Sequence, residues 1–115
     1  MTNFDIHEMI YNFVVRVLKL TKCLARDKIN EVLLEQLVRC VTSIGANDQE
    51  ADGVSSKKDF IHCYTISRKE AKETLYWLRL IAQNNPDLSN RMSDLLKENE
   101  ELIKIISTII KNADK

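Results

Sequence analysis

The chain is poor in the residues that turn or break a polypeptide, with only two glycines and one proline. Because tight turns depend on these residues, an all-β fold with many hairpins is a poor match. The sequence also has no apolar run of about 18 residues, so we expect no transmembrane helix. Its 115 residues amount to one domain. We therefore expect a single domain over residues 1–115, built from long helices.

The chain also has no excess of charge of either sign. Seventeen basic residues balance 17 acidic ones, for a formal net charge of zero. A protein that binds nucleic acid over its whole surface needs an excess of basic residues, so zero net charge argues against this class of protein. Binding through a local basic patch stays an alternative. The first residues lack the basic start and apolar core of a signal peptide. We expect a cytoplasmic protein that does not associate with membranes.

Cysteine is scarce and widely spaced. Cys23, Cys40 and Cys63 form no C-x-x-C pair, so neither a zinc site nor a redox motif is indicated. Each cysteine lies in a helical pattern, where a free thiol behaves as a small hydrophobe. We expect no metal and no cofactor.

Apolar residues recur in steps of four and three along four segments, the spacing of helices that bury one face. The segments are about 5–25, 30–51, 56–84 and 88–111. Gly45 falls inside the second, where it costs about 1 kcal/mol relative to alanine. Gly53 suits a left-handed helix end, Ser56 suits a helix cap, and Pro86 stops the third segment. Four helices with short loops predict an all-α, antiparallel up-down-up-down four-helix bundle.

The third segment carries a second apolar stripe besides the one that faces the core. At about 100° per residue, Ile66, Trp77 and Leu80 fall together with Glu73 on the side away from the core seam. A second stripe that contains a tryptophan is typical of a subunit or partner interface. The alternative is that Trp77 lies flat at the margin of the bundle, under the neighbouring helix. We predict that these four residues form an interface between copies of the chain.

Four polar residues stand at or near core positions: Ser43, Asn47, Ser67 and Asn99. A functional role is one interpretation of such residues. The interpretation that we favour is that they form hydrogen bonds between helices and fix the helix register.

The first segment carries Arg16, Lys19, Lys22 and Arg26, with no acidic residue between Met9 and Arg26. Such a run could accept the phosphates of RNA or DNA. A solvated helix face is the other interpretation, because no aromatic residue lies among the basic ones to stack on bases.

No set of residues predicts catalysis. His7 lies in the first turn of its helix, where we expect it to be solvated, and His62 is next to Cys63 but points about 100° away from it. The Glu-x-x-His pairs of di-iron bundles and a glycine-rich phosphate loop are both absent. We expect Glu70 and Glu73 to form surface ion pairs with the basic residues around them. The chain is therefore not predicted to be an enzyme.

The middle of the sequence resembles a known family. Residues 35–51 (EQLVRCVTSIGANDQEA) match a Q-L-x-R-x-x-x-S-I-x-A-N-x-x-E-A signature, and residues 56–60 (SKKDF) are similar to S-x-K-E-F. Residues 69–80 (KEAKETLYWLRL) resemble K-E-A-x-E-T-x-Y-W-L-x-L. These are features of the bacterial four-helix bundle protein family, also called the 23S rRNA intervening-sequence proteins. Two places depart from the pattern: Asp48-Gln49 replaces small or apolar residues, and Ala51-Asp52-Gly53 replaces a glycine-rich ending.

The resemblance implies an up-down bundle that assembles into a homopentamer and has no established enzymatic activity. Related bundles serve diversity-generating retroelements as basic pentamers that bind nucleic acid and a reverse transcriptase, a role that zero net charge fits poorly. We predict a homo-oligomeric scaffold that contacts an unidentified protein or nucleic-acid partner. The alternative prediction is an RNA- or DNA-binding accessory module that uses the basic face of the first helix.

Overall fold

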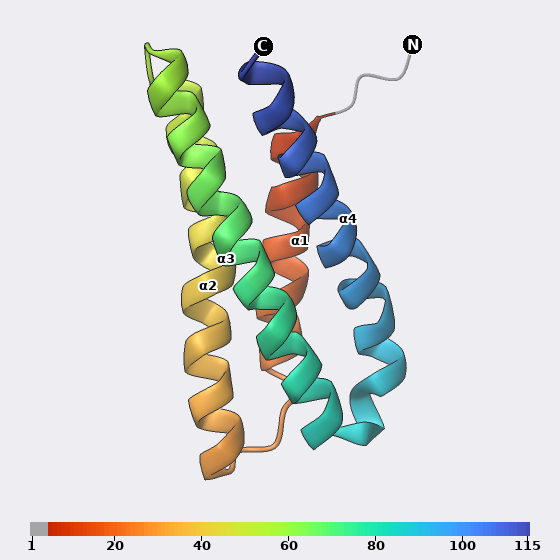
Figure 1. Ribbon diagram of the computed structural model, residues 1–115. Helices are drawn as coiled ribbons and strands as arrows, with labels where there is room; N and C mark the ends of the chain where they lie inside the picture. The colour runs from red at the N-terminus through yellow and green to blue at the C-terminus, as the bar shows by residue number, and fades with distance from the viewer. Residues whose placement is uncertain (1–4) are drawn as a thin grey trace.

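Four long helices make up residues 5–115, the part of the chain that the computed structural model describes (Figure 1). They are α1 (Ile6–Thr21), α2 (Lys28–Gly53), α3 (Lys57–Asn84) and α4 (Ser89–Ala113), and a short 3₁₀ helix, η1 (Pro86–Leu88), precedes α4. Residues 1–4, which the predicted domain and N-terminal segment included, lie outside the described residues. The predicted all-α class is confirmed.

The helices alternate in direction, so that α1 begins and α4 ends at the same end of the bundle (Figure 1). Each helix packs against its neighbours in the chain, and α4 closes the ring against α1. The α2–α3 contact is the most extensive and the α1–α4 contact the least. The antiparallel up-down-up-down four-helix bundle is therefore confirmed. It is elongated and flattened, with principal extents of 45 × 30 × 18 Å.

The first helix is shorter than its sequence pattern suggests. We expected it to reach about Ala25, but it ends at Thr21. After this point the backbone N–H groups of Lys22, Cys23 and Leu24 bond to carbonyls three positions earlier, which tightens the chain into a turn. The turn buries Leu24 in the core. As a result α1 has 16 residues against 25 to 28 in the other three helices.

Short polar side chains start three of the helices. Asp5 accepts hydrogen bonds from two backbone N–H groups of α1, Asp27 accepts one from Asn30, and Ser56 accepts one from Asp59. The expectation of a left-handed Gly53 is wrong, because no described glycine has a positive φ. Gly53 is instead the last helical residue, and an extended Val54 ends α2.

The core is apolar and draws on all four helices. None of the helices within residues 5–115 is long and apolar enough to cross a membrane. The largest fully buried apolar side chains are Ile10, Phe13, Val17, Leu37, Val41, Ile44, Leu78, Ile81, Met92, Leu102 and Ile106.

Polar residues near the core differ in how they bond. Ser67 donates to the carbonyl of Ile44 (3.1 Å), and the amide of Asn99 donates to the carbonyl of Ala71 (2.9 Å), so these two connect different helices. Ser43 and Asn47 do not. The Asn47 amide donates to the Ser43 carbonyl (2.9 Å) and hydroxyl (3.2 Å), four positions away on the same helix. The prediction of interhelical bonds for this pair is therefore wrong, because one helical turn already brings the two side chains together.

A buried pair of asparagines ties two corners of the bundle together, and sequence reasoning missed it. The Asn30 amide donates to Asn85 Oδ1 (3.0 Å) and to the Ala25 carbonyl (3.0 Å), and Asn85 donates back to Asn30 Oδ1 (2.9 Å). Asn30 is fully buried at the start of α2, and Asn85 ends α3. The pair therefore joins the α1–α2 corner to the α3–η1 corner.

We expect Asn30→Ala to lower the free energy of unfolding by about 2 to 4 kcal/mol, because it removes several buried hydrogen bonds and takes away the donor to the buried Asn85 Oδ1. Urea denaturation measures the change. Asn90→Ala, at an exposed site on α4, is the matched control and should stay within about 0.5 kcal/mol of the wild type. Equal stability of the two variants would contradict a structural role for the asparagine pair.

Gly45 lies inside α2 where it faces α1. A Cβ atom at this position would lie 3.6 Å from Val14 Cγ2, which is an ordinary van der Waals distance. We therefore expect Gly45→Ala to raise the free energy of unfolding by about 1 kcal/mol, because alanine restricts the unfolded chain and favours a helix. Gly53→Ala, at the end of α2, should raise the free energy of unfolding by less than Gly45→Ala does. Destabilisation by Gly45→Ala in the same denaturation experiment would show that α1 and α2 require the glycine.

Candidate interaction surface

Apolar side chains gather on the outer edge of the α2–α3 pair, near the end of the bundle where α2 begins. Ile29 and Val32 of α2 are 61% and 55% exposed, and Tyr76 of α3 is 55% exposed. A hollow of about 360 Å³ lies between Ile29 and Leu33 on one helix and Leu80 on the other. Leu80 also lines a neighbouring hollow of about 310 Å³ with Tyr76, on the side of α3 that faces Leu96 of α4. We call Ile29, Val32, Leu33, Tyr76 and Leu80 the α2–α3 patch.

The predicted interface stripe runs along this same edge but is half-buried. Ile66, Glu73, Trp77 and Leu80 are all partly covered, and Trp77 packs against the hydrophobic core. The Trp77 ring meets the Tyr76 ring edge to face, with centroids 5.1 Å apart. Trp77 therefore lies at the bundle margin, and the exposed aromatic surface belongs to Tyr76. Sequence reasoning missed Tyr76, Ile29 and Val32. The periodicity of one helix does not show which of its margin residues stay exposed, nor which residues of another helix lie beside it.

A charged cluster lies farther along the same edge. The Arg39 guanidinium of α2 contacts Glu73 (3.3 Å) and Glu70 (3.8 Å) of α3. The buried Cys40 thiol lies 3.2 Å from the same Glu73 oxygen. The expected ion pairs of the two glutamates with their own helix are therefore replaced by pairs with α2. Hydrogen bonds from Cys40 and Arg39 lower the pKa of Glu73.

Three of these groups are of types that bind metal ions. Ligand atoms of Cys40, Glu70 and Glu73 lie within 4.8 Å of one another. A cysteine binds a metal ion as its thiolate. Burial and the hydrogen bond to Glu73 raise the pKa of Cys40 to about 12, so Cys40 keeps its proton at neutral pH. The Arg39 cation already lies against both carboxylates. The residues therefore fit an ion-pair cluster better than a metal site.

The basic residues of the first helix do not form one surface. Arg16 forms an ion pair with Glu98 of α4, and Lys19 is exposed in the last turn of α1. Lys22 and Arg26 follow the end of the helix and line a hollow of about 400 Å³ that also has acidic residues of α2 in its wall. The predicted basic face of the first helix is therefore wrong for Lys22 and Arg26, because α1 ends at Thr21.

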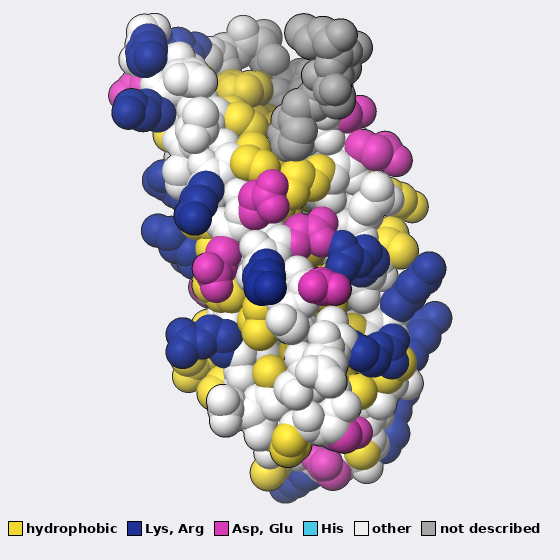
Figure 2. Space-filling view, turned by 90° about the vertical axis from the view of Figure 1, so that its right-hand side faces the viewer, with side chains coloured by type: hydrophobic (Ala, Val, Ile, Leu, Met, Phe, Trp, Pro, Cys, Tyr) yellow, Lys and Arg dark blue, Asp and Glu magenta, His cyan; other side chains and the backbone are white. Residues whose placement is uncertain are grey.

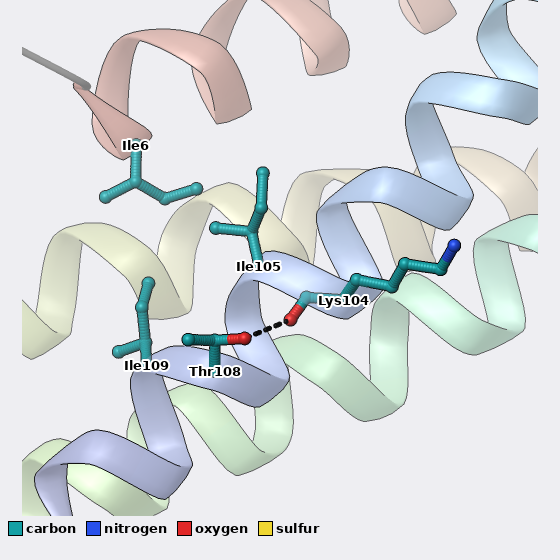
Figure 3. A pocket seen from close by; sticks show the side chains of 5 residues that line it. All are labelled: Ile6, Lys104, Ile105, Thr108 and Ile109. Atoms are coloured by element: carbon teal, nitrogen blue, oxygen red, sulfur yellow. Dashed lines mark hydrogen bonds between the residues drawn. The ribbon is translucent and has the colours of Figure 1, made fainter.

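The α4 side of the bundle is mixed in charge. Lysine and arginine side chains are interspersed there with aspartate and glutamate, and the largest group of hydrophobic side chains shows near the upper end, with others scattered over the rest of this face (Figure 2). At that end an apolar groove of about 590 Å³ lies between α1 and α4. Ile6 of α1 points toward Ile105 and Ile109 of α4 across it (Figure 3). This groove lies at the opposite end of the bundle from the α2–α3 patch.

A second polar cluster joins three helices at the end of the bundle that holds the α1–α4 groove. Asp48 of α2 is 1% exposed and accepts a hydrogen bond from the Tyr64 hydroxyl of α3 (2.7 Å). His7 Nδ1 of α1 lies 2.9 and 3.0 Å from the two Asp48 oxygens. The expectation of a solvated His7 is therefore wrong in part: its side chain is 41% exposed but bonded across the bundle. The hydrogen bond to Asp48 raises the pKa of His7, and burial raises the pKa of Tyr64, which keeps its proton.

Comparisons with known proteins agree on the family. Residues 2–108 match the family described as 23S rRNA-intervening sequence protein. A crystal structure of a protein with unknown function from the S23 ribosomal protein family of Bacteroides thetaiotaomicron is similar, with 34% sequence identity and a TM-score of 0.85. The match covers 93% of this chain and 99% of that one. A search of curated proteins gives no match. The chain therefore belongs to the 23S rRNA-intervening sequence protein family.

Proposed function

We propose that this protein is a non-catalytic helical scaffold whose copies associate through the α2–α3 patch. The observation that carries the proposal is the group of apolar residues on α2 and α3, in which Ile29, Val32 and Tyr76 are each more than half exposed and Leu80 lines the hollows beside Ile29 and Tyr76. A contiguous exposed apolar surface of this kind marks an interaction site. Trp77 lies next to Tyr76 of the patch, and Arg39 lies farther along the same edge. Tyrosine, tryptophan and arginine are the residues that contribute most to binding at interfaces.

The chemistry of the polar clusters supports the absence of catalysis in this proposal. Cys40 holds its proton at neutral pH, since its pKa is about 12, so it is a weak nucleophile. His7 lies between Asp48 and Asp52, which favour its charged form over the neutral form that a general base needs. Three free cysteines are also in keeping with a reducing compartment, and we infer that the protein works in the cytoplasm.

The family resemblance supports a homopentamer as the assembled state. A closed ring of identical subunits uses two different surfaces, whereas a two-fold dimer uses the same patch on both subunits. In a pentamer the α2–α3 patch would meet a different face of the next copy. The partner of the assembled scaffold, protein or nucleic acid, would then bind elsewhere on the ring.

We expect Ile29→Asp and Tyr76→Asp to dissociate the assembly, because each places a charge in an apolar contact that must be desolvated. Sedimentation velocity should give the 13.3 kDa monomer for both variants and a larger species for the wild type. Circular dichroism should show unchanged helicity, because both side chains are exposed in the subunit.

Tyr11→Asp is the matched control for this experiment. Tyr11 is 63% exposed on α1, away from the patch. Its replacement should leave the assembly intact if the second surface of the ring lies elsewhere, and dissociation by Tyr11→Asp together with the patch variants would place that second surface on α1. Variants at the patch that sediment like the wild type would overturn the proposed interface. Trp77→Asp is a poorer test, because Trp77 also packs against the core and its loss would destabilise the subunit.

Nucleic-acid binding through α1 is the competing function, and the charge arrangement supports it less. Arg16 is paired with Glu98, and the remaining basic residues are divided between the helix and the turn that follows it. We expect no binding of structured RNA or duplex DNA in fluorescence anisotropy at low salt. Binding that falls steeply with salt, and that Lys19→Glu abolishes while Lys72→Glu on α3 does not, would favour this function instead.

A further inference from the structure

The first two turns of α1 pack against the core through Ile10 and Met9 and lie next to two surface hollows. The groove of about 590 Å³ beside Ile6 separates them from α4. On the other side, a hollow of about 370 Å³ lies between α1 and α2, lined by residues that include His7, Tyr11 and Gly45. Ile10 is buried and lines the second hollow. This end of α1 therefore has open space beside it toward both α4 and α2, and the hydrogen bond of His7 to Asp48 links it to α2.

The charged groups closest to His7 are acidic and come from α2 and from the cap of α1. Asp48 of α2 is within hydrogen-bond distance of Nδ1, and Asp52, also of α2, lies 4.0 Å from Nε2. Asp5, which caps α1, adds a third negative charge. From α3 the Tyr64 hydroxyl faces Asp48, and α4 presents Lys104 to the groove beside Ile6.

We propose that His7, Asp48 and Tyr64 form a proton-operated latch that holds the first two turns of α1 on the α2–α3 pair while His7 is charged and loosens them when it is neutral. Asp48 is nearly inaccessible to solvent, so these two partners supply the hydrogen bonds that water would otherwise give to its carboxylate oxygens. Tyr64 stays bonded in both states, whereas the charge of His7 changes near neutral pH. Loosening α1 would join the two hollows that flank it.

The direction of the pH effect follows from the contacts. The hydrogen bond to Asp48 and the three acidic charges raise the pKa of His7 above its ordinary value of 6.5, although partial burial opposes them. A group whose pKa is higher in the folded state contributes stability that is complete below its unfolded pKa and lost as the pH rises through its folded pKa. The latch therefore closes in mild acid and opens above the raised pKa of His7.

Hydrogen–deuterium exchange of the full chain tests the proposal. Between about pH 5.5 and pH 8.5, protection of the backbone amides in residues 8–12, corrected for intrinsic exchange, should fall about threefold to tenfold. Peptides from the α2–α3 contact should keep their protection and so report any global loss of stability. His62→Gln, at an exposed site on α3, should behave as the wild type does. His7→Gln should show low protection at every pH.

A second measurement, the pKa of the His7 imidazole, does not depend on the motion of α1. In the His62→Gln variant His7 is the remaining histidine, so its imidazole proton resonances can be titrated without overlap. Its pKa should lie above 6.5, and Asp48→Asn should lower it. Protection of α1 that does not change with pH, or that changes equally in His7→Gln, would overturn the latch. Loss of the latch would leave assembly through the α2–α3 patch untouched, because the two sites lie at opposite ends of the bundle.

Discussion

The packing of α2 against α3 is the contact on which the rest of the bundle depends. These two helices are the longest, and their contact is the most extensive in the fold. In a four-helix ring each helix is covered by two neighbours, so the outer edge of the α2–α3 pair stays open to solvent. Apolar and aromatic residues on that edge are left over after the core is complete. The same geometry that stabilises one subunit thus leaves a surface suited to a second one.

Much of the fold could be predicted because it depends on local patterns. Helical periodicity and the scarcity of glycine and proline are enough to indicate four helices, and Asp5 and Ser56 are recognisable caps. The end of α1 could not be predicted, because Leu24 continues the apolar pattern although the chain has already turned there. The predicted left-handed conformation of Gly53 was wrong for a similar reason, because glycine permits this conformation but does not require it.

The candidate sites were less predictable, because they depend on pairs that are distant in sequence. The stripe around Trp77 is visible in α3 alone, but its exposed continuation, Ile29 and Val32, belongs to the start of α2. Asp48 stands out in the sequence as a departure from the family pattern. Its partners lie 41 residues before it and 16 residues after it, however, and no local signal connects them. Sequence patterns therefore identified residues of interest more readily than the contacts that give them a role.

Self-association of the subunit would be seen at once in the solution mass of the wild-type protein. Light scattering behind a sizing column, repeated over a range of protein concentrations, gives the mass without a shape assumption. We expect a multiple of 13.3 kDa, with five copies if the assembly is the pentamer that the family resemblance implies. A constant 13.3 kDa at every concentration would contradict it. The α2–α3 patch would then have to serve a different protein.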